Sequence, residues 1–85
     1  MAVVLVPSLV AAQAGGKKRF EVDAGTVGEA LRGLPVSDLL FDERGELRPL
    51  VNIYVDQEDI RSGDGIETTL SGDETIRVVA AIAGG

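Results

Sequence analysis

The pattern of apolar and polar positions predicts two strands in the first quarter of the chain, one from a continuous apolar run and one from alternation. Residues 3–10 form an apolar run rich in β-branched side chains and interrupted by Pro7. This run predicts a first strand that bends or lies partly at a sheet edge. Residues 18–23 alternate, with Phe20 and Val22 on one face, as in a half-buried strand. Paired glycines between the two runs are typical of a turn, so we expect a hairpin.

A helix is predicted next. Thr26 and Glu29 have the spacing of a capping box, in which the Thr26 hydroxyl accepts from the Glu29 N–H and the Glu29 side chain returns to Thr26. Apolar side chains follow at helical spacing: Val27, Ala30, Leu31 and Leu34. Gly33 and Pro35 end the helix. Residues 36–41 then predict a short irregular or helical turn that closes over the core.

Three further strands are predicted in the second half of the chain. Residues 50–55 alternate strongly, residues 56–59 read as a turn, and a short strand is expected to start at Ile60. Residues 74–79 form the last strand. The order of strand, strand, helix, strand, short strand and strand predicts an α+β fold of the β-grasp type, with a mixed sheet on one main helix.

The last strand leads into a small-residue tail. Residues 1–79 are expected to form the β-grasp domain and residues 80–85 a flexible tail that ends in Gly-Gly. Alternation turns Ile76 and Val78 toward the core and Val79 outward. An outward apolar stripe then leads to the glycines, and we expect it to dock a partner. The stripe consists of Val79, Ala80, Ala81, Ile82 and Ala83.

Composition restricts the chemistry of this chain. It has 85 residues, no Cys and no His, so thiol nucleophiles, thiolate metal sites and Ser-His pairs are excluded. The net charge of −6 argues against nucleic acid or an anionic membrane as partner. An acidic surface suits a basic partner, although it also keeps a small domain soluble. The apolar start is too short for a signal sequence or a membrane span, and we expect a cytoplasmic protein.

The α-carboxylate of Gly85 is the most plausible reacting group. Gly84 carries no Cβ, so a narrow active site on a partner can admit the chain end. Other clusters favour ordinary structure. The carboxylates of residues 56–59 lack the spacing of a calcium loop, and Gly63-Asp64-Gly65 has no following Lys for a phosphate loop. Residues 17–19 read as a solvated basic hairpin edge more readily than as a phosphate site.

Several segments together resemble the ThiS/MoaD family of ubiquitin-like sulfur carriers, over nearly the whole chain. The segments are Val51-Asn52-Ile53-Tyr54-Val55, Leu70-Ser71-Gly72-Asp73 and Ala83-Gly84-Gly85. Softer similarity, including Val6-Pro7-Ser8-Leu9 and Thr26-Val27-Gly28, points to the CysO-type branch. The resemblance implies a ubiquitin-like β-grasp fold. Many members carry proline just before the last residues, where this chain has Ala80-Ala81, and the departure bears on partner choice.

The resemblance also implies a mechanism. A ubiquitin-activating-type enzyme, with or without a rhodanese domain, would use ATP and Mg to adenylate the Gly85 carboxylate. Sulfur from a persulfide or sulfide would then displace AMP and leave a thiocarboxylate. The acceptor would be a PLP-dependent cysteine synthase, or a thiazole synthase-like enzyme in ThiS-like systems, and a JAMM-type metalloprotease is a further implied partner. The carrier would bind no cofactor and would not itself be an enzyme.

Two alternatives remain open at the level of sequence. The same activated Gly85 could form isopeptide bonds with target lysines, as a ubiquitin-like protein modifier does. The chain could also be a β-grasp binding module with an incidental ending. A thiocarboxylate would favour the sulfur carrier. A conjugate that resists boiling and thiol would favour the protein modifier. Function that survives deletion of Gly84-Gly85 would favour the binding module. The sequence names neither the final sulfur acceptor nor the oligomeric state.

Overall fold

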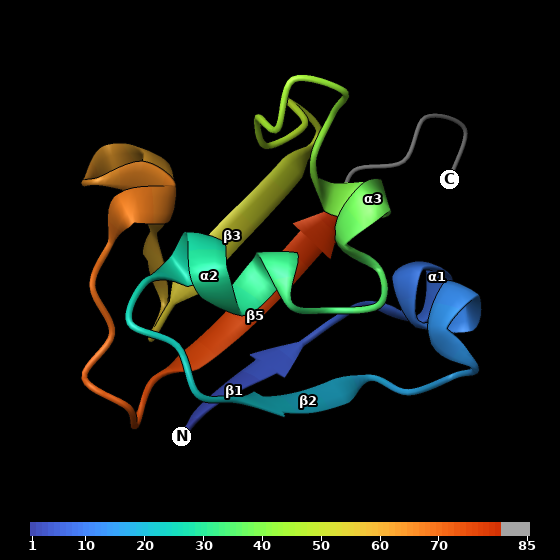
Figure 1. The fold of residues 1–85 in the computed structure, drawn as a ribbon, viewed down its shortest axis with the longest axis horizontal. Coiled ribbons are helices and arrows are strands. Elements are labelled where there is room, and N and C mark those ends of the chain that lie inside the picture. Colours follow the sequence, from blue (N-terminus) through green and yellow to red (C-terminus); the bar gives the residue numbers. More distant parts are fainter. Residues whose placement is uncertain (81–85) are drawn as a thin grey trace.

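The computed structural model describes residues 1–80, in which five strands form one mixed sheet (Figure 1). The strands are β1 (Ala2–Leu5), β2 (Arg19–Val22), β3 (Val51–Val55), β4 (Glu58–Asp59) and β5 (Thr75–Ala80). Their order is β2-β1-β5-β3-β4. The central pair β1 and β5 is parallel and the other neighbours are antiparallel. This topology, with a helical crossover between β2 and β3, confirms the ubiquitin-like β-grasp fold.

Short helices cover one face of the sheet (Figure 1). The helical segments are α1 (Ser8–Ala11), η1 (Ala12–Ala14), α2 (Val27–Arg32), α3 (Ser37–Leu40), η2 (Ile60–Ser62) and η3 (Gly65–Glu67). Between helices and sheet lies an aliphatic core whose largest fully buried side chains are Leu31, Leu40, Ile53, Ile76, Val4, Val27 and Val36. On the opposite face, which we call the open face, side chains such as those of Tyr54 and Arg77 remain half-buried or exposed.

The start of α2 confirms the predicted cap with one change of partner. The Glu29 N–H donates to Thr26 Oγ1 at 3.2 Å, as expected. The Glu29 carboxylate, however, accepts from the Gly25 N–H at 3.0 Å rather than from Thr26. The carboxylate reaches the residue before the cap because the Thr26 backbone is extended, with φ −138° and ψ 162°. The first bond satisfies an N–H group that a helix start leaves free, and the second ties the preceding residue to the first turn.

The predicted first strand is wrong in its length and in its place in the sheet. It ends at Leu5, and Pro7 is the N-cap residue of α1 instead of lying within a strand. Proline suits a helix start because its missing N–H would have no intrahelical partner there. The Pro7 carbonyl accepts from the Ala11 N–H at 2.8 Å. β1 is also central, between β2 and β5, and not at an edge. The antiparallel pairing of β1 with β2 is confirmed.

The short strand after β3 was predicted to start at Ile60 and instead spans Glu58–Asp59. Asp56 and Gln57 have φ of 48° and 79°, so a two-residue turn returns the chain directly onto β3. Glu58 then pairs with Val55. Ile60 follows this strand as the first residue of η2 and is buried in the core.

Candidate functional site

Strand β5 carries the chain from the core to the base of the tail. Ile76 and Val78 are buried, whereas Arg77 is exposed and Val79 is 40% exposed. The predicted alternation is therefore confirmed. Val79 pairs with Asn52 of β3, and Ala80, the last described residue, pairs with Val51. The remaining predicted docking and reacting positions lie outside the described residues: Ala81, Ile82, Ala83, Gly84 and Gly85.

The exposed large apolar side chains come from segments near the end of the sheet where β5 ends. Apart from Met1, those of residues 1–80 belong to four separate segments, and we call them the apolar rim: Leu9, Leu39, Leu50 and Val79. Leu50 directly precedes Val51, the partner of Ala80. Leu9 lies in α1 and Leu39 in α3, and both helices stand at this end of the sheet (Figure 1). Such a concentration is typical of a docking surface.

Sequence reasoning missed most of the rim. Leu9 was assigned to a strand and Leu39 to the turn that closes over the core, yet Leu39 is 40% exposed and its neighbour Leu40 is fully buried. The missed signal was Pro7 as a helix start, which would have placed Leu9 on a short surface helix. Leu50 was read as the first residue of a strand.

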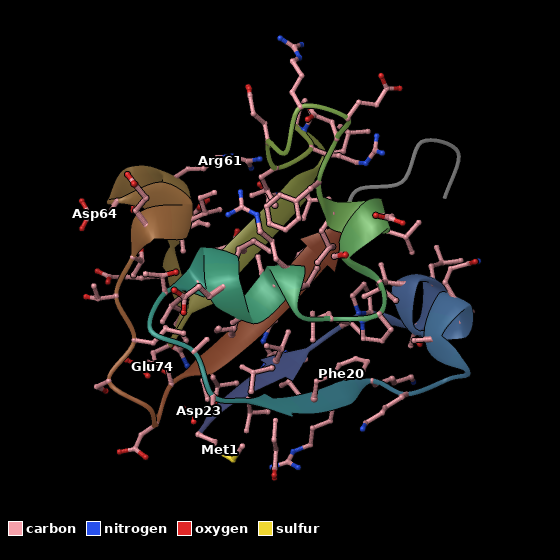
Figure 2. The ribbon with its side chains drawn as sticks, viewed as in Figure 1. Met1, Phe20, Asp23, Arg61, Asp64 and Glu74 are labelled. Atoms are coloured by element: carbon pink, nitrogen blue, oxygen red, sulfur yellow. The ribbon has the colours of Figure 1, made fainter. Side chains whose placement is uncertain are left out.

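Two arginines tie the rim segments to the sheet. The Arg48 N–H donates to the Leu40 carbonyl at 2.8 Å, and the Arg48 carbonyl accepts from the Val51 N–H at 3.0 Å. Arg61, labelled in Figure 2, donates from Nη2 to that same Arg48 carbonyl at 3.2 Å. Its Nη1 donates to Oδ1 of Asn52. Arg61 therefore fixes the start of β3 opposite the end of β5.

A groove runs along the open end of β1 and β5. It has a volume of about 260 Å³ and is lined by Leu5, Val6, Pro7, Arg77, Val78 and Val79. It lies where β1 has ended and β5 continues. Its walls are mainly aliphatic, with the Arg77 guanidinium as the charged group. This shape accepts a small apolar side chain of a partner better than a polar ligand.

The turn before β5 is held by a single carboxylate. Glu74, labelled in Figure 2, accepts from the Ser71 N–H at 2.7 Å, the Ser71 hydroxyl at 3.0 Å and the Gly72 N–H at 2.9 Å. These donors, the Ser71 N–H foremost, lower the pKa of Glu74 from 4.5 to about 2, because they stabilise the ionised form. The ionised Glu74 carboxylate therefore stabilises the turn at residues 71–74, which directly precedes β5.

The other clusters weighed from the sequence serve the fold. Asp56 Oδ1 accepts from the Thr75 N–H at 3.0 Å, and Asp59 Oδ1 accepts from the Arg61 N–H at 2.9 Å. Within residues 1–80 no group of three acidic side chains is arranged to hold a metal ion. Lys17 lies 5.2 Å over the Phe20 ring, and Arg19 forms an exposed ion pair with Glu21 at 3.0 Å. None of the described helices is long and apolar enough to cross a membrane.

The β-grasp sheet, with a final strand that leads into the Gly-Gly end of the chain, defines a ubiquitin-like protein. The sequence profile of the ThiS family matches residues 4–85, and the chain belongs to this family. It is 30% identical over 89 residues to the sulfur carrier protein CysO of Mycobacterium tuberculosis, and the match covers 96% of each chain. The expected family resemblance is thereby confirmed.

Solved structures agree with the fold. The chain matches a chain in the crystal structure of the BexX/CysO complex of Amycolatopsis orientalis with a TM-score of 0.86 and 29% identity. The match covers 100% of this chain and 100% of that chain. The chain also matches the crystal structure of SAMP1 from Haloferax volcanii with a TM-score of 0.76 and 22% identity, covering 99% of this chain and 98% of that one. At that lower identity the second likeness concerns the fold alone.

Proposed function

We propose that the chain is a sulfur carrier whose Gly85 carboxylate is adenylated and then converted to a thiocarboxylate. The observation that carries the proposal is the family match over residues 4–85, which includes the Gly84-Gly85 end, on a fold whose central strand leads into that end. The similarity to sulfur carrier proteins of the CysO type supports the same assignment.

The chemistry divides between carrier and partner. In the first step a carboxylate oxygen of Gly85 attacks the α-phosphate of ATP, with Mg on the partner, and pyrophosphate leaves. In the second step hydrogen sulfide attacks the acyl carbon of the adenylate, AMP leaves, and a proton is released. A carboxylate alone is a poor electrophile, and the adenylate supplies the leaving group. The described residues lack Cys and His, so we assign both catalytic steps to the partner.

The carrier's own contribution is docking and delivery. The apolar rim belongs to segments near the end of β5, and Val79 lies on β5 itself, so a partner that covers these side chains buries apolar surface near the point where the tail begins. A solved relative of this fold is described in a complex with BexX, which supports a carrier that works while docked. We propose an adenylating enzyme of the ubiquitin-activating type as the first partner and a sulfur-accepting synthase as the second.

The test is the intact mass of the purified chain before and after incubation with MgATP, sulfide and the adenylating enzyme of the same source. A gain equal to one sulfur-for-oxygen exchange supports the carrier function. Conjugates to lysine that survive boiling and thiol, without that gain, would instead favour the protein-modifier function. Activity of a chain that lacks Gly84-Gly85 would contradict both.

A further inference from the structure

Strand β5 is longer than its neighbour β1, and the difference leaves a free strand edge at the base of the tail. The last rung between the two parallel strands pairs Leu5 with Arg77, whereas β5 continues to Ala80. The Val3 N–H donates to the Glu74 carbonyl at 3.0 Å. In a parallel ladder this bond fixes which main-chain groups of β5 face β1, namely those of residues 74, 76, 78 and 80.

Pro7 is the reason that the ladder stops. The next rung would require the N–H of residue 7 to donate to the Val78 carbonyl, and proline has no N–H. The Pro7 carbonyl, which would accept from the Ala80 N–H, instead accepts from the Ala11 N–H at 2.8 Å and turns into α1. Among the main-chain bonds of the described residues outside the strand ladders, none ends on the Val78 carbonyl.

Strand β3 does not use these groups either. The Asp56 N–H donates to the Thr75 carbonyl at 3.0 Å, so odd-numbered residues of β5 bond toward β3. Val79 pairs in this way with Asn52, and the main chain of Ala80 points to the opposite side. The Val78 carbonyl and the Ala80 N–H therefore form one acceptor and one donor on a strand edge that β1 leaves uncovered.

The groove described above lies beside this edge. Leu5 and Pro7 line one wall and Val78 and Val79 the other, with Arg77 among the lining residues. A strand edge with free main-chain groups selects an extended segment, because only an extended backbone presents a donor and an acceptor at the matching spacing. The aliphatic walls select a small apolar side chain on that segment.

We propose that an extended segment of the adenylating enzyme adds to this edge of β5, takes the position that β1 vacates at Pro7, and places an apolar side chain in the groove. Its N–H donates to the Val78 carbonyl and its carbonyl accepts from the Ala80 N–H. The addition continues the sheet along the base of the tail, which aligns the chain end with the enzyme's site. This inference rests on the proposed function and specifies how the partner docks.

Amide hydrogen exchange of the unaltered chain tests the proposal directly. In the free protein the Ala80 amide should exchange fast, whereas the Val79 amide is already bonded to β3. In the complex with the adenylating enzyme that forms the thiocarboxylate, we expect strong slowing at Ala80. Ala80 exchange that stays fast in the saturated complex would overturn the proposal while the carrier function stands.

A matched pair of variants provides the second measurement. Ala80→Pro removes the N–H that faces the edge and no N–H that faces β3, whereas Ala80→Gly retains it. We expect Ala80→Pro to bind the enzyme about three- to tenfold more weakly than Ala80→Gly, the effect of one hydrogen bond. Equal affinities would overturn the proposal, as would a dimer of the free carrier in light scattering that protects Ala80 without enzyme. Loss of thiocarboxylate formation with every enzyme would instead contradict the proposed function.

Discussion

At the scale of single residues, the proposed function depends on two kinds of side chain near the C-terminal end: small ones in the tail and apolar ones at the end of β5. Gly84 illustrates the first kind. Gly84→Val should leave the unfolding free energy unchanged and should reduce thiocarboxylate formation by more than about tenfold, because a β-branched side chain obstructs a narrow channel. Intact-mass analysis against time measures the rate. A variant that is thiocarboxylated at the normal rate would contradict the narrow-channel argument.

Val79 illustrates the second kind, since it is the member of the apolar rim closest to the tail. Val79→Asp should weaken binding of the adenylating enzyme about tenfold or more, because a charge replaces exposed apolar surface in the proposed contact. Calorimetric titration gives the affinity. Gln57→Asp is the control, since it adds the same charge at an exposed turn between β3 and β4. If both variants bind equally well, Val79 lies outside the interface.

For single residues, the sequence predicted which way a strand side chain faces better than it predicted the hydrogen-bond partners of a side chain. Alternation placed Val79 outward and Ile76 and Val78 inward, because the two-residue period of a strand leaves no other choice. The capping pair was predicted in kind, but the Glu29 acceptor was assigned to the wrong N–H. Arg61 was not predicted at all, because its partners, Asn52 Oδ1 and the Arg48 carbonyl, lie 9 and 13 residues away in the sequence.

At the scale of elements, Glu74 connects pH to the start of β5. Its pKa is lowered from 4.5 to about 2 in the folded chain, so the carboxylate stabilises the fold above about pH 4.5. That contribution is lost as the pH falls toward 2. The difference in unfolding free energy between the chain and Glu74→Gln should therefore shrink over this range.

Urea unfolding at a series of pH values measures this difference. Glu43→Gln is the control, because the Glu43 side chain forms no hydrogen bond within residues 1–80. A constant difference for Glu74→Gln from pH 5 to pH 2 would mean that the carboxylate does not hold the turn.

Arg61 acts on a second element, the start of β3. Arg61→Leu removes the bonds to Asn52 and to the Arg48 carbonyl, so the unfolding free energy should fall by about 1 kcal/mol. Amide exchange at Val51 should accelerate, because the Arg48 carbonyl that accepts its N–H loses its second donor. Arg44→Leu, in the exposed loop, is the matched control. Equal stability of the two variants would contradict the role assigned to Arg61.

Element prediction failed where one residue changed the direction of the chain. Pro7 was read as an interruption of a strand, although it starts α1 and thereby ends β1 at Leu5. The apolar run alone could not distinguish the two, because Val10 and Ala11 are buried in the helix as they would be in a strand. The short strand was predicted two residues too late, because the two-residue turn before it needs a left-handed backbone at Gln57, which is unusual for that residue type.

At the scale of the whole molecule, the mixed β-grasp sheet could be predicted because the sequence of elements admits few connections, whereas the central place of β1 was not predicted. A hairpin, a helical crossover and a final strand place β5 beside β1 in parallel, as observed. The apolar rim could not be predicted, since its members come from positions 9, 39, 50 and 79 and their exposure is decided only when the helices pack on the sheet.

The central claim is that sulfur is carried at the Gly85 carboxylate, and mass mapping of the reacted chain tests it most directly. After incubation with MgATP, sulfide and the adenylating enzyme, cleavage after Arg77 releases residues 78–85 as one peptide. Our account predicts that this peptide alone gains one sulfur in exchange for oxygen, with fragmentation locating it at Gly85. A fully active enzyme that leaves this peptide unchanged, or sulfur found elsewhere in the chain, would contradict the account.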